Sequence, residues 1–111
     1  MRAGEVIRRF DGLHRNSLPL ALKLDSLCDL ESRIAREFGF EAPVSLSEDS
    51  SLIARDHGDI YYLHLCSRLD FENGDFERFN NDMAVFAERY GEFAAGIVRS
   101  RSRGGHLKVG L

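Results

Sequence analysis

Residues 73–99 read NGDFERFNNDMAVFAERYGEFAAGIVR, and this stretch decides the fold. Its large apolar side chains, spaced alternately three and four residues apart, form an aromatic seam: Phe76, Phe79, Met83, Phe86, Tyr90, Phe93 and Ile97. A period of about 3.5 residues is typical of helices that pack together at shallow angles. We therefore predict a helix over about 75–99, capped by Asp75, with Phe79 and Phe86 buried against its neighbours.

A second stripe on this helix carries mostly small residues. At about 100° per residue, the positions that fall together are Asn80, Ala84, Ala87, Gly91 and Ala94 or Ala95. Glycine inside a helix costs about 1 kcal/mol relative to alanine, and the close approach of another helix would offset this cost. That helix belongs either to the same chain, as residues 18–38, or to another chain. Asn81 lies nearly opposite the aromatic seam, and nothing within a single helical hairpin explains it.

The residues before this helix predict its partner. Apolar side chains between residues 59 and 72 cover most of a helix circumference, at Ile60, Leu63, Leu65, Cys66 and Leu69. A helix that is apolar nearly all round is usually central and buried. Asp59 is the candidate N-cap, and Asn73-Gly74 ends the helix in a turn where Gly74 is expected to have a positive φ. The short link predicts an antiparallel helical hairpin over about 59–99.

Two further helices are expected upstream, over about 3–13 and 18–38. Ser17 can cap the second, Pro19 suits its first turn, and Gly39 suits a left-handed C-cap. Pro43, four serines and clustered acidic residues predict an irregular loop at 39–57, in which 44–47 alternate like a short strand and 51–54 could be extended. The predicted fold class is all-α: a small helical bundle with a long antiparallel hairpin and one irregular loop.

Length and charge indicate how the chain is organised. The 111 residues, 43% hydrophobic and 30% charged, are enough for one domain, which we place at 1–98. The net charge of −3 is unevenly spread: residues 1–23 carry +3, residues 24–98 carry −10 and residues 99–111 carry +4. We expect residues 99–111 to form a flexible basic tail. An acidic body with basic flanking segments suits electrostatic contact with another subunit or another protein.

No catalytic, cofactor-binding or metal-ligating residues are predicted, so we do not expect an enzyme. His64 and Cys66 would point about 200° apart on a helix, and His57 and His64 would lie roughly 10 Å apart along it. Neither pair can share a metal ion. The two cysteines, Cys28 and Cys66, are expected to be free thiols. No apolar run approaches the roughly 20 residues that span a membrane, and the acidic body argues against sequence-specific DNA binding.

The run from Tyr61 to Met83, YYLHLCSRLDFENGDFERFNNDM, resembles a pattern in small prophage and tailed-phage proteins. That pattern is roughly YYL…(I/L)D(F/Y)xNG(E/D)(Y/F)xR(Y/F)NNxM, followed by an aromatic-bearing helix. Residues 22–34 are similar to the second helix of the same family, the head–tail connector (adaptor, head completion) proteins. The matching motif residues here are Asn73, Gly74, Arg78, Phe79, Asn80 and Asn81. The chain departs from the family just before the third helix, where residues 52–58 lack a proline.

The resemblance implies a structural protein of the virion neck, present in the host cytoplasm before assembly. Copies would form a ring, twelvefold in the virion, between the portal protein and a downstream tail or stopper protein. DNA would pass through the ring without sequence-specific binding. The residues expected at subunit or portal contacts are Leu52, Ile53, Arg55, Asn81, Ala84, Arg99, Arg101, Arg103 and Lys108. The alternative is a cytoplasmic helical protein-binding module, such as an antitoxin or a regulatory adaptor. A small DNA-associated regulator is a third hypothesis.

Overall fold

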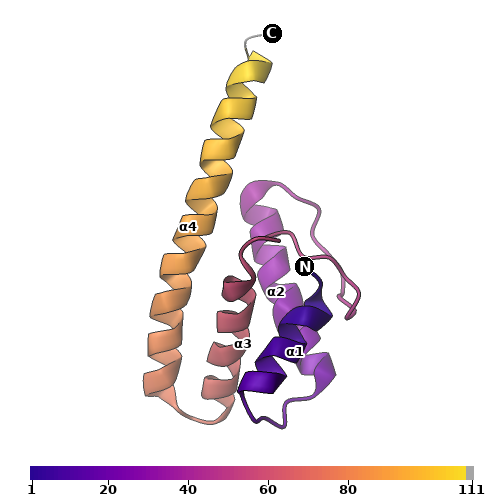
Figure 1. The fold of residues 1–111 in the computed structure, drawn as a ribbon, viewed down its shortest axis with the longest axis vertical. Coiled ribbons are helices and arrows are strands. Elements are labelled where there is room, and N and C mark those ends of the chain that lie inside the picture. The colour runs from indigo at the N-terminus through magenta and orange to yellow at the C-terminus, as the bar shows by residue number, and fades with distance from the viewer. Residues whose placement is uncertain (110–111) are drawn as a thin grey trace.

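The computed structural model describes the backbone of residues 1–109 and the side chains of residues 1–102. Four helices follow one another along the chain: α1 (Ala3–Leu13), α2 (Leu20–Phe38), α3 (Gly58–Glu72) and α4 (Phe76–Val109) (Figure 1). The residues described form no named strand, so the all-α fold is confirmed. The helices predicted at 3–13, 18–38 and 59–72 are all present, with starts that differ by at most two residues.

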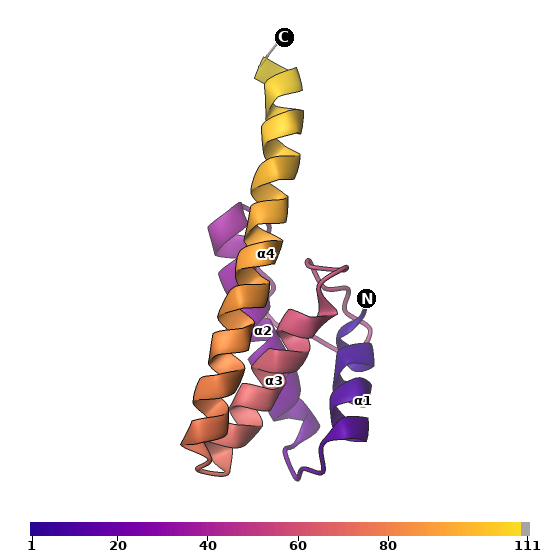
Figure 2. The same cartoon turned by 60° about the vertical axis from the view of Figure 1, so that its left-hand side comes forward.

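The centre of the bundle is α3. It packs against α1, α2 and α4, and Ile60, Tyr61 and Leu65 on it are fully buried. Figure 2 shows α3 between α4 on one side and α1 on the other, with α2 behind. The prediction that the helix apolar nearly all round lies at the centre is therefore confirmed.

The turn between α3 and α4 has the geometry that the Asn73-Gly74 pair predicts. Gly74 has a φ of 71°, in the left-handed region. The Asp75 N–H donates to the Asp70 carbonyl at 2.9 Å, which closes the turn. Asp75 Oδ1 then accepts the Arg78 N–H at 3.2 Å and caps α4. The predicted antiparallel hairpin is confirmed, as are Gly74 in its turn and Asp75 as the cap of α4.

We expect Gly74→Ala to lower the free energy of unfolding by about 1–2 kcal/mol, because an L-residue is strained in the left-handed region. A Cβ at Gly74 would meet no atom within 4 Å, so the cost comes from the backbone alone. Gly91→Ala is the matched control: that site inside α4 is equally open, and alanine there should raise stability by up to about 1 kcal/mol. Urea titrations measure both changes, and an unaltered midpoint for Gly74→Ala would contradict the strain.

Two of the predicted helix caps are wrong. The N-cap of α2 is Pro19 rather than Ser17, so the proline also lies just before the first turn and not in it. In the segment before it, Asn16 Oδ1 accepts the Leu18 N–H at 3.1 Å. The N-cap of α3 is His57, and Asp59 lies inside the first turn, where its charge still favours the helix N-terminus. Gly39 has a φ of 78° and donates its N–H to the Ala35 carbonyl, so the C-cap of α2 is confirmed.

The loop at 39–57 forms no strand at 44–47, so that prediction is wrong. Part of the loop instead caps α1: the carbonyls of Ser50 and Glu48 accept the N–H groups of Ala3 and Gly4 at 2.9 and 2.8 Å. These N–H groups have no partner inside the helix, which is why an extended segment is stable against them. Ser51 forms an isolated antiparallel bridge with Arg2, consistent with the extended backbone expected at 51–54.

A buried carboxyl group holds the next part of the loop in place. Glu31 on α2 accepts hydrogen bonds from the Tyr61 hydroxyl and, at 2.9 Å, from the Ile53 N–H. The Tyr61 oxygen accepts the Ala54 N–H at 3.0 Å. Burial raises the pKa of the Glu31 carboxyl, partly offset by the two hydrogen bonds that it accepts. This network joins α2, α3 and the loop at the centre of the core.

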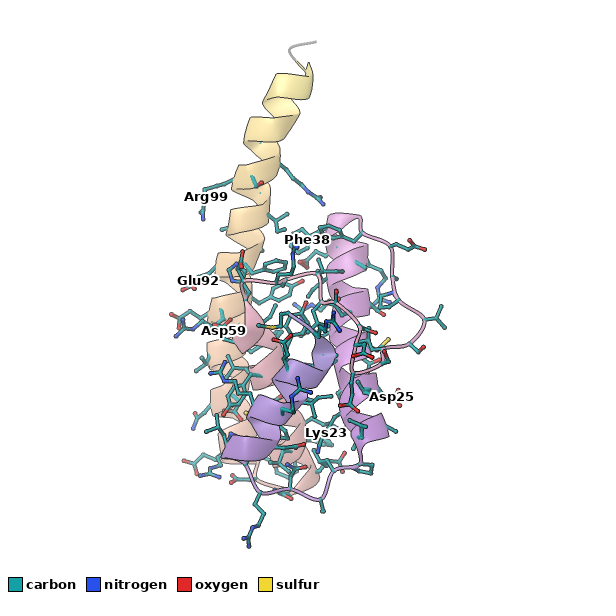
Figure 3. All side chains as sticks on the ribbon, turned by 45° about the vertical axis from the view of Figure 1, so that its right-hand side comes forward. Lys23, Asp25, Phe38, Asp59, Glu92 and Arg99 are labelled. Carbon is teal, nitrogen blue, oxygen red and sulfur yellow. The ribbon has the colours of Figure 1, made fainter. Side chains whose placement is uncertain are left out.

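The fourth helix is longer than predicted: α4 continues through Val109 instead of ending at residue 99. Arginine is a good helix former, and adding a turn to an existing helix costs far less than starting one. The molecule measures 54 × 29 × 20 Å, and the last turns of α4 project beyond the bundle (Figure 1). Arg99 lies on this projecting part (Figure 3). The predicted flexible tail is thus helical through Val109, and residues 110–111 lie outside the described residues.

Candidate interaction surfaces

The aromatic seam of α4 is only partly buried. Phe86, Tyr90 and Phe93 lie in the core, and the last two contact Phe38 of α2 with ring centroids 6.5 and 5.6 Å apart. Toward the hairpin turn, Phe79 is half-buried, whereas Phe76 is 56% and Met83 37% exposed. The burial of Phe86 is confirmed, and that of Phe79 is confirmed only in part. The difference arises because α2 contacts α4 through Phe38 but does not cover its first turns.

The small-residue stripe faces away from the bundle. Of its members, Asn80, Ala84, Ala87, Gly91 and Ala95 are exposed, and Ala94 is half-buried. A Cβ at Gly91 would meet no atom within 4 Å. The prediction that this stripe packs against α2 of the same chain is therefore wrong, because α2 contacts the side of α4 that carries the aromatic seam. The stripe is open to another chain.

The predicted contact residues before α3 do not all reach the surface. Leu52 is only 2% exposed and belongs to the core, so its assignment to an interface is wrong. Apolar periodicity in a loop gives no sign of which side faces inward. Ile53 is half-buried and is held by its N–H bond to Glu31, while Arg55 is exposed.

The predicted contact residues on α4 are more accessible. Asn81, Ala84, Arg99 and Arg101 are all exposed, and at 100° per residue Asn81, Ala84 and Arg99 fall on one side of the helix. The Arg101 guanidinium lies over the Phe40 ring, 5.3 Å from its centroid, and so joins the projecting turns to the loop after α2. The side chains of Arg103 and Lys108 lie outside the described residues.

The motif that carries the family resemblance divides into two parts. Asn73 and Gly74 make the turn, Arg78 approaches Asp75 with 3.7 Å between Nε and Oδ2, and Phe79 packs on the Phe71 ring at 5.7 Å. These residues shape the hairpin. Asn80 and Asn81 are exposed and make no side-chain hydrogen bond within the described residues, so the fold of the monomer does not account for them.

A polar cleft of about 610 Å³ lies between the end of α1, α3 and the start of α4. At one side of it, His14 Nε2 lies 2.6 Å from the Tyr62 hydroxyl and 3.6 Å from Cys66 Sγ. Burial raises the pKa of the Cys66 thiol to about 11, so the sulfur stays protonated at neutral pH and is a poor nucleophile. The cluster joins α1 to α3 by hydrogen bonds and stacking; sequence reasoning missed it, because its members are 48 and 52 residues apart.

The other side of the cleft holds a carboxyl pair. Asp70 on α3 and Asp82 on α4 line it together. Burial, followed by the hydrogen bond and the charge of Asp70, raises the pKa of Asp82 to about 7. The two residues are twelve apart in sequence and meet only because the hairpin folds back. The sequence therefore gives no signal for the pair.

We expect Asp82→Asn to change how stability depends on pH. Because the pKa of Asp82 is higher in the folded chain than its ordinary 3.8, wild-type stability should fall as pH rises from about 4 to 7. The variant should lose this dependence and be the more stable protein at pH 8. Thermal unfolding at pH 4 to 8 measures it, with Glu88→Gln, an exposed carboxylate on the same helix, as the control. Parallel pH curves for wild type and Asp82→Asn would contradict the carboxyl pair.

Within the part of the chain that the structure describes, no three side chains of His, Cys, Asp or Glu come together as a metal site. None of the helices described there has the length and apolar character needed to cross a membrane. Comparison of the chain with protein-family models, with curated proteins and with solved structures gives no match.

Proposed function

We propose that this protein is a structural component of a phage virion neck, where copies form a ring that joins the portal of the head to the tail. The observation that carries the proposal is the open outer side of α4. Asn81 and Ala84 are exposed there near the hairpin turn, and the monomer gives them no role. Asn81 belongs to the motif that resembles head–tail connectors, and Ala84 follows this motif directly after Met83. A surface kept free of intramolecular contacts suits a protein that works through contacts with other chains.

The shape and charge of the molecule support the same function. The last turns of α4 project beyond the bundle and carry the exposed Arg99 and Arg101, whereas residues 24–98 carry a net charge of −10. The opposite charges of the acidic body and the basic projecting end orient neighbouring subunits and speed their association, although single surface ion pairs add only about 0–1 kcal/mol each. The partners would be further copies, the portal and a tail or stopper protein, in the virion after assembly in the host cytoplasm.

A phage that lacks this gene tests the proposal. We expect filled heads and free tails that do not join, with joining restored when purified protein is added to the extract. Electron microscopy of portal-containing heads incubated with the protein should show an added ring below the portal. Normal infectious particles without the gene would exclude the neck function and leave the protein-binding module as the better hypothesis.

Removal of residues 99–111 should leave folding intact but reduce head–tail joining severalfold. The buried core residues lie upstream of residue 99, and the truncation shortens only the projecting end of α4. It removes four basic residues whose charge complements the acidic body. Circular dichroism melting checks the fold, and in vitro complementation checks the joining. Removing only Gly110 and Leu111 is the control. Joining at full strength by the longer truncation would show that this segment has no part in assembly.

A further inference from the structure

An apolar groove runs along the side of the bundle where α2 leaves the first turns of α4 uncovered. It has a volume of about 290 Å³, with α3 as its floor. Apolar side chains from α3 and α4 line it: Phe71, Phe79, Met83 and Phe86. Phe71 is 54% exposed and stacks edge-on with the equally exposed Phe76 at the mouth. Several neighbouring large apolar side chains in contact with water mark a place where another chain binds.

The groove also contains a polar group without a partner. Ser26 lines it from α2, is almost fully buried, and its Oγ makes no hydrogen bond within the described residues. A buried hydroxyl without a partner costs about 1–3 kcal/mol. The oxygen has almost no surface open to the groove, so we do not assign it a contact with an occupant.

Among the described residues, the rim of the groove carries one arginine that is not part of an ion pair. Arg33, Arg68 and Asp29 line the rim, and Arg68 is paired with Glu72 at 3.0 Å. The Arg33 guanidinium stacks over the Phe86 and Tyr90 rings, 5.7 and 4.4 Å from their centroids, and forms no ion pair within the described residues. Burial lowers the pKa of His64 in the groove floor, so the imidazole adds no charge at neutral pH. The groove therefore favours an apolar occupant with a carboxylate placed beside Arg33.

The loop after α2 has these properties. Residues 40–50 contain three acidic residues, Glu41, Glu48 and Asp49, and no basic residue. Val44 at its tip is 100% exposed. Among the described residues, the backbone N–H groups at 41, 42 and 44–46 form no backbone hydrogen bond, whereas Ser50 and Leu52 further along the loop are tied to the N-terminus. The Pro43 carbonyl accepts the Cys28 thiol at 3.8 Å. The tip thus offers an apolar side chain, a negative charge and N–H groups without a backbone partner.

We propose that the groove binds the loop tip of a second copy of this chain, with Val44 against Met83 and Phe79, and Glu41 near Arg33. Groove and loop are different surfaces, so the contact is head-to-tail, and repeated contacts of this kind close into a ring when the rotation per subunit allows it. The inference deepens the proposed function by naming how neighbouring copies meet.

Cysteine pairing tests the contact directly. In a Cys28→Ser background, chains carrying Val44→Cys are mixed with chains carrying Met83→Cys at high concentration and oxidised; the buried Cys66 stays in place. Because a disulfide requires Cα atoms within about 7 Å, we expect a cross-linked heterodimer from this mixture. A mixture of Val44→Cys with Glu88→Cys, on the outer side of α4, is the control and should give no cross-linked heterodimer. A chain that carries both Val44→Cys and Met83→Cys should give a ladder of multimers.

Sedimentation of Val44→Asp gives an independent measurement, because an exposed loop residue can change without affecting the fold. We expect self-association about 10- to 100-fold weaker than that of wild type, the loss typical when one buried aliphatic side chain is lost from a contact. No cross-link and no effect of Val44→Asp would overturn the contact, even if rings are seen below the portal. A cross-linked ladder from a protein that is dispensable for head–tail joining would establish the contact and remove the neck function.

Discussion

Phe86→Ala should lower the free energy of unfolding by about 3–5 kcal/mol, the usual cost of truncating a buried aromatic residue. Phe86 is 3% exposed, stacks on Tyr90 at 5.6 Å, lies 6.1 Å from the His64 ring and supports the Arg33 guanidinium. Its removal leaves a cavity where α2, α3 and α4 meet. Urea denaturation followed by circular dichroism measures the loss.

Phe76→Ala is the matched control, since it removes the same side chain from the same helix. Phe76 is mostly exposed and contacts only Phe71 among the aromatic rings, so its truncation should cost about 1 kcal/mol or less. Equal losses for the two variants would show that the seam is buried along its whole length. A loss below about 1 kcal/mol for Phe86→Ala would show that the seam does not face the core.

The helices were predictable because their signals are local. The 3-4 spacing on α4, the apolar circumference of α3, and the glycines at 39 and 74 each depend on a few neighbouring residues, and the structure agrees with all of them. The failed predictions have different causes. The cap of α2 is Pro19, two residues after Ser17, so that error is a small shift of the helix start. Residues 44–47 do not form a strand, because a strand needs a partner that no sequence spacing reveals.

The surfaces were harder to predict than the helices. Periodicity identified one side of α4 as apolar, but it could not show that α2 covers only Phe86, Tyr90 and Phe93 and leaves Met83 open. The small-residue stripe could be identified from the sequence. Whether it faces residues 18–38 of the same chain or another chain could be decided only from the position of α2. The groove, the carboxyl pair and the buried Glu31 all depend on contacts between residues at least twelve apart. Such contacts are fixed by tertiary packing alone.

Glu31→Ala should be the second most damaging substitution, with a loss of about 2–4 kcal/mol. It removes the acceptor for the Tyr61 hydroxyl and the Ile53 N–H, and a buried donor without a partner costs about 1–3 kcal/mol. The loss should also release the loop segment that covers the core, seen as faster amide exchange at Ile53 and Ala54. Thermal or urea unfolding together with hydrogen exchange measures both effects.

Glu31→Gln separates hydrogen bonding from packing and charge. Glutamine keeps the length of the side chain and one amide oxygen as an acceptor, so it should lose less stability than alanine. Burial raises the pKa of Glu31 in the folded chain above its ordinary 4.5, so folding favours the protonated carboxyl group. The free energy of unfolding of the wild type is therefore highest at low pH and falls as pH rises above about 4.5. The gap between wild type and Glu31→Gln should therefore narrow from pH 4 to pH 8. If glutamine and alanine are equally damaging at every pH, neither the shape of the side chain nor a single acceptor oxygen is enough, and both carboxyl oxygens are needed to fasten the loop to α2 and α3.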